Sequence, residues 1–275
     1  MPDDQAIAGR PAPVCERHGV AKDAIAAAPN RAQLWICPKC ADEDRSRATR
    51  LAHFDHDQKT RAAEQQRKQA DLERRIGAAC IPERYRDYTF DTFPNTDERA
   101  VVVLQRMRTY ANRWYEAKKR GVSVLLLGDV GTGKTGIACA TANQIVRMDH
   151  QTALFITAYG AVRHMRDTWG RKGKTEREAL DDLLLPDLLI LEEVGANVGS
   201  DAEMTALFEV LNGRYAARKP TFVLSNLPLD DFRDAAGSPR PGLQTFLGQR
   251  VIDRFRDDGS FVVSLDWPSL RGARK

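Results

Sequence analysis

The stretch of sequence that decides the fold is Gly128-Asp129-Val130-Gly131-Thr132-Gly133-Lys134-Thr135, which Gly136 follows. It matches the pattern G-x-x-x-x-G-K-[ST], in which a curled loop presents backbone amide groups to phosphate oxygens. Glycines permit the curl, and the helix expected after the loop adds the positive end of its dipole. The apolar run at residues 122–128 supplies the buried strand that the motif requires. This context favours a nucleotide-binding loop over a glycine-rich turn that contains Lys-Thr by chance.

Two residues of this loop and two acids downstream are expected to form the ATP and magnesium site. Lys134 would reach the β- and γ-phosphates, and the Thr135 hydroxyl would bind Mg²⁺. Glu192 and Glu193 follow the apolar residues of DLLILEEV, where a neighbouring strand ends. We expect Glu192 to hold the ion, through water, and Glu193 to activate the attacking water as general base. An ordinary solvated turn is the alternative, which the phosphate loop disfavours.

Asn226 ends a further apolar run, TFVLSN. A neutral amide at this position could sense the γ-phosphate or orient the water beside Glu193. An asparagine before Leu-Pro is equally typical of a turn. The sequence leaves both interpretations open.

Apolar runs alternate with helical patterns between residues 98 and 226, which predicts a doubly wound α/β sheet. The interpretation places strands at 122–128, 152–158, 187–194 and 221–226, and helices at 98–120, 160–169 and 201–218. Basic residues concentrate between two of these strands and could contact DNA phosphates or be solvated loop charges: Arg163, Arg166, Arg171, Lys172 and Lys174.

The composition describes a globular protein with one main domain and a small appendage. The chain has 275 residues, of which 42% are hydrophobic and 29% charged. No apolar run approaches the roughly 18 residues that cross a bilayer, and the amino terminus does not resemble a secretory signal, so we expect a cytoplasmic protein. The net charge of +4 permits contact with nucleic acid without requiring it.

Cysteine and histidine near the amino terminus predict a zinc site. Cys15 and His18 form one pair with a two-residue spacer, Cys37 and Cys40 form another, and 18 residues lie between the two pairs. Three thiolates and one imidazole suit the tetrahedral coordination of zinc, and a segment this short needs the metal to fold. Cys80 and Cys139 lack such partners and are expected to be buried thiols.

The order of these features predicts four regions. Residues 1–14 form a disordered leader, and 15–41 form the zinc-binding segment. Residues 42–79 form a polar helix that ends at Gly77, a linker or partner-binding arm too polar to bury a full face. Residues 80–275 form the ATPase domain, which begins with the irregular lead-in IPERYRDYTFDTFPNT.

The residues quoted above resemble DnaC-type replicative helicase loaders of the AAA+ class, in a form found in phages and prophages. The resemblance covers most of the chain and includes Cys-x-x-His-Gly, Trp-x-Cys-Pro-x-Cys, Ile-Pro-Glu-Arg-Tyr, GDVGTGKT, DLLILEEVG, SNLP, GQRVIDRFRDDGS and Asp-Trp-Pro-Ser-Leu-Arg. It implies an AAA+ fold with a parallel sheet flanked by helices. Family members usually carry Asp-Glu where this chain has Glu192-Glu193. Magnesium keeps water ligands readily, so its binding should persist, but the substitution leaves the rate of hydrolysis unpredicted.

The resemblance also implies roles for three arginines. Arg250 and Arg254 are candidates for the arginine finger that a neighbouring subunit inserts toward the γ-phosphate, and Arg271 matches the sensor 2 arginine. Because Arg250 and Arg254 are four residues apart, they could instead share a solvated helix face.

The function implied is ATP-dependent loading of a hexameric, DnaB-like replicative helicase onto single-stranded DNA by AAA+ domains that associate with one another. The amino-terminal region would bind the helicase. An IstB-like transposition helper is the alternative within the same fold, and an ATP-gated DNA-binding switch with little turnover is the alternative without catalysis. A zinc-dependent transcription factor lacks support, because no recognition helix is evident.

Overall fold

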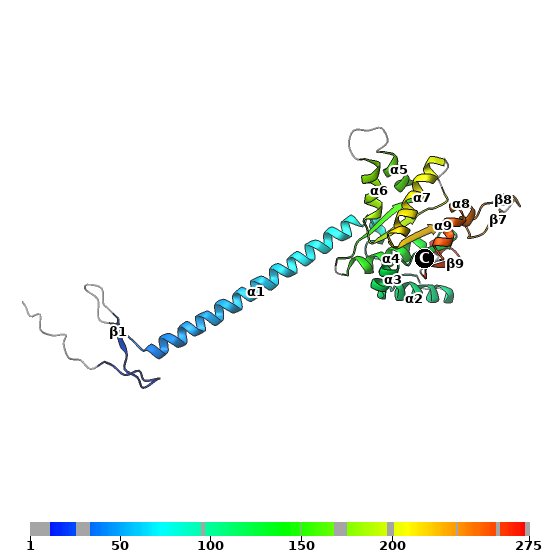
Figure 1. Cartoon of the computed structure of the whole chain (residues 1–275). Helices are drawn as coiled ribbons and strands as arrows, with labels where there is room; N and C mark the ends of the chain where they lie inside the picture. Colours follow the sequence, from blue (N-terminus) through cyan, green and yellow to red (C-terminus); the bar gives the residue numbers. More distant parts are fainter. Residues whose placement is uncertain are drawn as a thin grey trace, which may run out of the picture. The chain divides into compact units, whose positions relative to one another are not determined.

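The computed structural model describes residues 12–25, 34–94, 97–148, 150–167, 175–196, 201–234, 236–256 and 259–272 (Figure 1). The chain divides into two compact units, residues 1–69 and 70–275, and each is considered by itself. No helix among the described residues is long and apolar enough to cross a membrane.

The second unit contains a five-stranded parallel sheet with the order β4-β5-β6-β3-β9. Nearly all residues of its three central strands are buried, as expected of a sheet covered on both faces. The strands are β3 (Val124–Gly128), β4 (Ala153–Thr157), β5 (Leu188–Glu192), β6 (Thr221–Ser225) and β9 (Phe261–Leu265).

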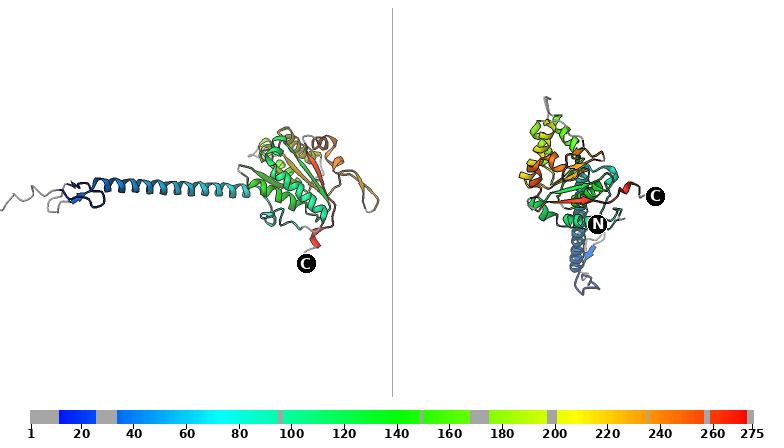
Figure 2. Two further views of the ribbon diagram at one scale, coloured as in Figure 1. Left: turned by 90° about the horizontal axis from the view of Figure 1, so that it is seen from below. Right: turned by 90° about the vertical axis from the view of Figure 1, so that its right-hand side faces the viewer.

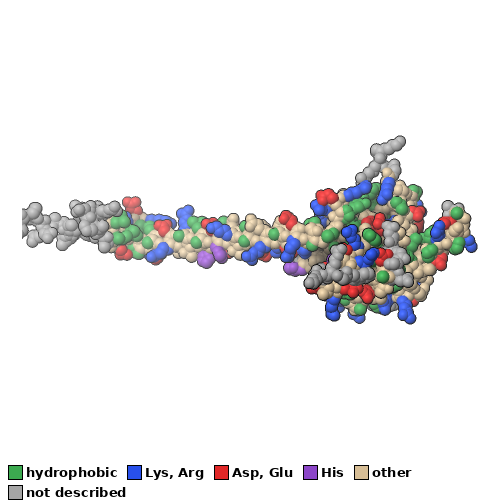
Figure 3. Space-filling model, turned by 90° about the horizontal axis from the view of Figure 1, so that it is seen from above, with side chains coloured by type: hydrophobic (Ala, Val, Ile, Leu, Met, Phe, Trp, Pro, Cys, Tyr) green, Lys and Arg blue, Asp and Glu red, His purple; other side chains and the backbone are tan. Residues whose placement is uncertain are grey.

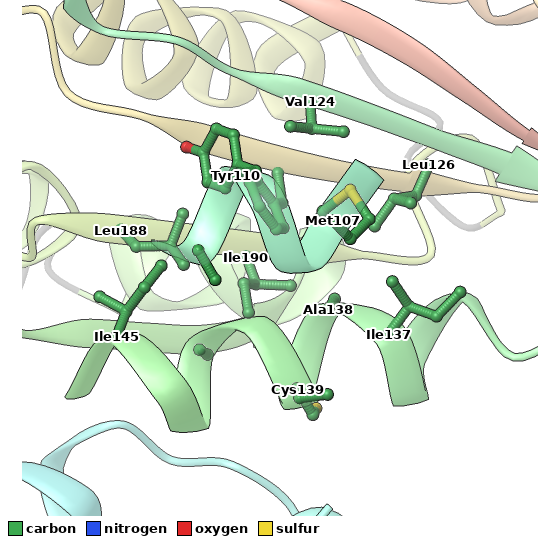
Figure 4. Close-up of a cluster of buried hydrophobic side chains, with 14 of the residues drawn as sticks. Met107, Tyr110, Val124, Leu126, Ile137, Ala138, Cys139, Ile145, Leu188 and Ile190 are labelled. Carbon is green, nitrogen blue, oxygen red and sulfur yellow. The ribbon is translucent and has the colours of Figure 1, made fainter. Parts of the chain in front are cut away.

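Helices cover both faces of this sheet (Figure 2). One face packs against α2 (Glu98–Asn112), α3 (Trp114–Arg120) and α4 (Lys134–Val146). Figure 4 shows Met107 and Tyr110 of α2 beside apolar side chains of α4 and of the sheet. The other face packs against α5 (Ala158–Arg166), α6 (Glu176–Leu184), α7 (Asp201–Ala216), α8 (Leu243–Leu247) and α9 (Gln249–Arg254).

Successive strand residues enter opposite cores. Val124 and Leu126 belong to the core under α4, whereas Leu125 and Leu127 belong to the core under α5 and α7. This two-residue period explains why the run is apolar throughout rather than alternating.

The expected strands and helices are present, with local differences. The helix expected over 98–120 is two helices, because the backbone leaves helical geometry at Arg113 (φ −100°, ψ 27°). The break lets α3 bury Trp114, whose indole N–H donates to Gln151 Oε1 at 2.8 Å. The prediction did not include α6, β9 or the exposed hairpin of β7 (Phe232–Arg233) and β8 (Pro239–Arg240).

A buried arginine joins three segments of this unit. Arg214 of α7 is 0% exposed, and its guanidinium donates to five backbone carbonyls and to the Thr221 hydroxyl. The carbonyl acceptors belong to Leu183, Leu184, Pro186, Asp187 and Pro220. Arg214 therefore fixes the end of α6 and the approaches to β5 and β6, since a buried cation needs all its donors satisfied.

The first unit contains a short antiparallel pair, β1 (Asp23–Ile25) and β2 (Leu34–Ile36), and most of α1 (Pro38–Ala78). No residue of α1 is buried, and charged side chains of both signs follow its length (Figure 3). The polar helix is therefore as expected, but it begins at Pro38 and includes Gly77, which was expected to end it.

Candidate functional site

The loop of residues 128–136 joins β3 to α4, as the motif requires. Gly128, Gly131 and Gly133 all have positive φ. A Cβ atom on Gly131 would lie 2.1 Å from Ser269 Oγ, and one on Gly133 would lie 2.6 Å from Phe93 Cζ. Glycine is therefore required at both positions by backbone conformation and by close approach.

The two functional side chains of this loop have partners inside the site. Lys134 Nζ donates to the carbonyl oxygens of Gly128 at 2.6 Å and Asp129 at 2.8 Å. The Thr135 hydroxyl donates to Glu192 Oε1. This last contact places a hydroxyl and a carboxylate oxygen side by side, the ligand types that Mg²⁺ prefers.

Burial shifts the pKa values of both charged groups. It lowers the pKa of Lys134 to about 8, with Asp129 and Glu192 acting in the opposite direction. It raises the pKa of Glu192, and the neighbouring charge of Glu193 adds to that effect. Both shifts indicate that burial disfavours the charged form of these side chains. A bound ligand of opposite charge would stabilise that form: a triphosphate for Lys134 and a cation for Glu192.

Glu193 and Asn226 follow adjacent strands at the same edge of the sheet. Glu193 has a left-handed backbone conformation (φ 59°), which is uncommon for a residue other than glycine. The amide of Val194 donates to Leu224 O at 3.0 Å, and Ser225 Oγ donates to Val194 O at 2.7 Å. These bonds hold the turn after β5 against β6 and so fix the position of Glu193.

These groups line one pocket of about 540 Å³. Its lining includes nine residues predicted from the sequence: Val130, Gly131, Gly133, Lys134, Thr135, Gly136, Glu192, Glu193 and Asn226. Arg271 also lines it, as the resemblance implies. Asp129 and Thr132 belong to the loop through hydrogen bonds within it.

The sequence prediction missed one wall of this pocket, which the lead-in before α2 supplies. Arg84, Tyr85, Tyr88 and Pro94 line it. Asn143 of α4 donates to the carbonyls of Tyr85 at 2.8 Å and Tyr88 at 2.9 Å, which ties the lead-in to the helix after the phosphate loop. The aromatic residues of this segment could have indicated a surface for the planar base of the nucleotide. The prediction missed them because they are far from the phosphate loop in the sequence.

Arg250 and Arg254 lie on α9, and neither lines this pocket. Arg254 is half-buried, donates to Asn212 and lies over the Tyr215 ring at 5.2 Å. Arg250 is exposed and has no hydrogen-bond or ion-pair partner among the described residues. The two arginines therefore have different surroundings, although the sequence did not distinguish them.

The basic cluster is only partly described. Arg163 and Arg166 lie on α5, and each is near a carboxylate: Asp167 at 3.8 Å and Glu203 at 2.6 Å. Arg171, Lys172 and Lys174 lie outside the described residues.

The amino-terminal unit brings the four predicted zinc ligands together. His18 Nδ1 lies 3.7, 3.6 and 3.3 Å from the sulfurs of Cys15, Cys37 and Cys40, and Cys15 Sγ lies 3.8 Å from Cys40 Sγ. A tetrahedron with zinc bonds of roughly 2.3 Å to sulfur and roughly 2.0 Å to nitrogen has edges of about 3.8 and 3.5 Å. The four ligand atoms therefore fit a zinc ion.

Two further features favour metal binding. His18 Nε2 lies 3.0 Å from Glu43 Oε1, a contact that orients the imidazole with Nδ1 toward the sulfurs. Although burial acts to raise it, the pKa of the Cys15 thiol falls to about 6, because the backbone amides of His18 and Arg17 stabilise the thiolate.

The expectation for the other two cysteines was half right. Cys139 is buried in α4, but Cys80 is exposed. The predicted burial of Cys80 was wrong. The preceding residue, Ala79, is 0% exposed, but the chain turns at Cys80, which has a left-handed backbone conformation (φ 51°).

A parallel sheet, a phosphate loop and an acidic strand end define a P-loop ATP-binding protein with the AAA+ fold. The chain belongs to the IstB-like ATP binding protein family, whose model matches residues 27–265. This match, together with the DnaC relatives described next, confirms the family resemblance noted in the sequence.

Curated relatives include proteins named replicative helicase loader DnaC. The one from Buchnera aphidicola subsp. Acyrthosiphon pisum is 28% identical over 73% of this chain and 76% of its own length. The one from Escherichia coli K12 is 26% identical over 76% of this chain and 80% of its own length.

Solved structures show the same fold. A DnaC helicase loader aligns with a TM-score of 0.54 at 20% identity, over 66% of this chain and 98% of that one. DnaI aligns with a TM-score of 0.53 at 19% identity, over 70% of this chain and 95% of that one.

Proposed function

We propose that this protein is an ATP-dependent loader that places a hexameric replicative helicase onto single-stranded DNA. The observation that carries the proposal is the likeness to replicative helicase loaders named DnaC over 73% of the chain. The nucleotide pocket supports the ATP dependence, because its cationic and acidic groups suit a triphosphate with its magnesium ion.

In this proposal the chain's own residues divide the work at the pocket. Lys134 and the loop amides bind the phosphates, and Thr135 and Glu192 bind magnesium, which would neutralise charge on the β- and γ-phosphates. Glu193 accepts the proton of the attacking water, and Asn226 orients that water or contacts the γ-phosphate. Arg271 adds positive charge at the triphosphate.

We further propose that residues 15–41, held by zinc, and the polar arm, residues 42–79, bind the helicase, while residues 80–275 form the ATPase. The segment that carries the metal ligands also has exposed apolar side chains, at Val14, Ile25 and Leu34, which are suited to a protein contact. In the single-strand contact, Arg163 and Arg166 would release their carboxylate partners to bind phosphate.

Capture of the helicase tests this function directly. Full-length protein with ATP and Mg²⁺ is expected to retain the replicative helicase of its native host and to accelerate its loading onto closed circular single-stranded DNA. Lys134→Ala is expected to abolish loading because it removes the phosphate contact. Retention of a transposase in place of the helicase would instead establish the transposition helper.

Arg250 is the better candidate for the arginine finger, because it is exposed and has no partner in the described part of the chain, whereas Arg254 is held by Asn212 and Tyr215. Arg250→Ala is expected to lower ATP hydrolysis by the assembled protein about 1,000-fold while the Kd for ATP is retained. Arg254→Ala is expected to lower the melting temperature, because it removes a hydrogen bond and a ring contact.

A mixing experiment distinguishes a finger acting on a neighbour from a role within one chain. Arg250→Ala and Glu193→Gln proteins, each nearly inactive alone, are expected to recover part of the activity together, because mixed interfaces contain one intact finger and one intact base. No recovery, or loss of hydrolysis without loss of stability in Arg254→Ala, would contradict the assignment.

A further inference from the structure

The segment after β9 is bonded to the phosphate loop. We call residues 266–272 the C-terminal strap. Its Trp267 is 4% exposed, and the indole Nε1–H donates to the Thr132 carbonyl at 2.9 Å. The backbone amide of Leu270 donates to the Gly131 carbonyl, also at 2.9 Å. Two successive carbonyls of the loop are thus held by the strap.

These bonds determine where the loop amides point. In a trans peptide the C=O and N–H groups point in opposite directions. When the Gly131 and Thr132 carbonyls turn toward the strap, the next two amides, those of Thr132 and Gly133, must turn away from it. The Thr132 amide accordingly points to Asp129 O at 3.4 Å, the oxygen that Lys134 Nζ also contacts.

Residues of the strap pack closely against two glycines of the loop. A Cβ on Gly131 would meet Ser269 of the strap at 2.1 Å, and one on Gly133 would meet Leu270 Cδ1 at 3.2 Å. The strap and Phe93 therefore pack against these glycines, and the side of the loop where Lys134 lines the pocket remains for a ligand.

The strap is itself fixed by the rest of the domain. Leu265, which precedes it, pairs with Gly128 in the sheet. Arg99 donates to the Asp266 carbonyl and forms an ion pair with Asp97, the N-cap of α2, at 2.7 Å. The loop is thus tied through the strap to both β9 and α2.

We infer that Trp267 is a positioning residue that holds the phosphate loop in its anion-binding conformation, with the amide of Gly133 aimed at the phosphates of the nucleotide and that of Thr132 bonded within the loop. The strap also carries Arg271 into the pocket, so one segment sets the loop and places a cation beside it. This inference rests on the proposed ATP site but is independent of the helicase.

Trp267→Phe tests the inference because it removes the indole N–H and keeps an aromatic ring. The dissociation constant for ATP is expected to rise about fivefold, from the loss of a hydrogen bond that preorganises the site. KM should rise in parallel, with kcat changed by less than about twofold, since the lost contact acts on binding. Hydrogen exchange at residues 128–134 should become faster.

Trp114→Phe is the matched control. Trp114 is also buried and also loses an indole hydrogen bond, to Gln151, but it does not line the pocket. It is expected to lower the melting temperature while the Kd for ATP stays at the wild-type value. Leu270→Pro removes the second bond to the loop, because proline has no amide hydrogen, and should also weaken ATP binding.

The outcomes are distinct. If Trp267→Phe is less stable but binds ATP as tightly as the wild type, Trp267 only packs the core and the inference is wrong. If Trp114→Phe weakens ATP binding equally, the effect is a general loss of stability, which also overturns it. A wild-type protein that binds no ATP would refute the proposed nucleotide site instead.

Discussion

Glu193→Gln is expected to lower the rate of ATP hydrolysis about 100-fold or more while ATP remains bound, because an amide cannot accept the proton of the attacking water. The left-handed turn after β5 fixes Glu193 in the pocket, and glutamine keeps its length and shape. Phosphate release at steady state, with single-stranded DNA present, measures the rate. Binding of a fluorescent ATP analogue measures retention of the nucleotide.

Two further variants make this result specific. Lys134→Ala is expected to lose nucleotide binding, and Glu192→Gln is expected to require more Mg²⁺ for the same rate, because a neutral amide is a weaker ligand than a carboxylate. If wild-type hydrolysis is no faster than that of Lys134→Ala, the protein is an ATP-gated switch. If Glu193→Gln retains the wild-type rate, another group is the base.

Removal of zinc is expected to unfold the amino-terminal segment and to abolish helicase capture. Cys15 and Cys37 are the only buried side chains among the described residues before α1, so apolar burial contributes little to folding there. The free energy of metal binding, on the order of 10 kcal/mol in zinc-binding peptides, must then supply the stability. Elemental analysis should find one zinc per chain, and a strong chelator should make this segment sensitive to protease.

Matched substitutions separate the metal effect from the loss of a thiol. Cys37→Ser is expected to lose zinc and helicase capture, while ATP binding, which belongs to the other unit, is retained. Cys80→Ser is the control, because Cys80 is exposed and outside the ligand cluster. Wild-type protein that contains no zinc yet resists protease would contradict this account.

Local sequence patterns predicted the central sheet and the phosphate loop well. The run at 122–128 and the loop after it obey rules that act within a few residues, so strand, turn and helix could be located together. The zinc ligands also come in two pairs, each with a two-residue spacer. The structure brings Thr135 into contact with Glu192, although they are 57 positions apart in the sequence, because parallel strands end at one edge of the sheet.

The missing parts depend on contacts between distant residues. Arg84 and Tyr88 reach the nucleotide pocket from a lead-in that Asn143 ties to α4, and Trp267 reaches Thr132 across 135 positions of sequence. The break at Arg113 likewise serves the burial of Trp114. No periodicity within a short window encodes such contacts. The contrast between Arg250 and Arg254 also required the side chains around them.

Arg214 shows how a position remote from nucleotide chemistry can govern whether the protein acts at all. Its guanidinium donates hydrogen bonds to five carbonyls at once. No other side chain has the planar fork of donors that this requires. A heritable change at this position would deplete the cell of the loader by exposing the chain to quality-control proteases. Such a lesion would imitate loss of ATPase function in a genetic screen, although every catalytic group was intact.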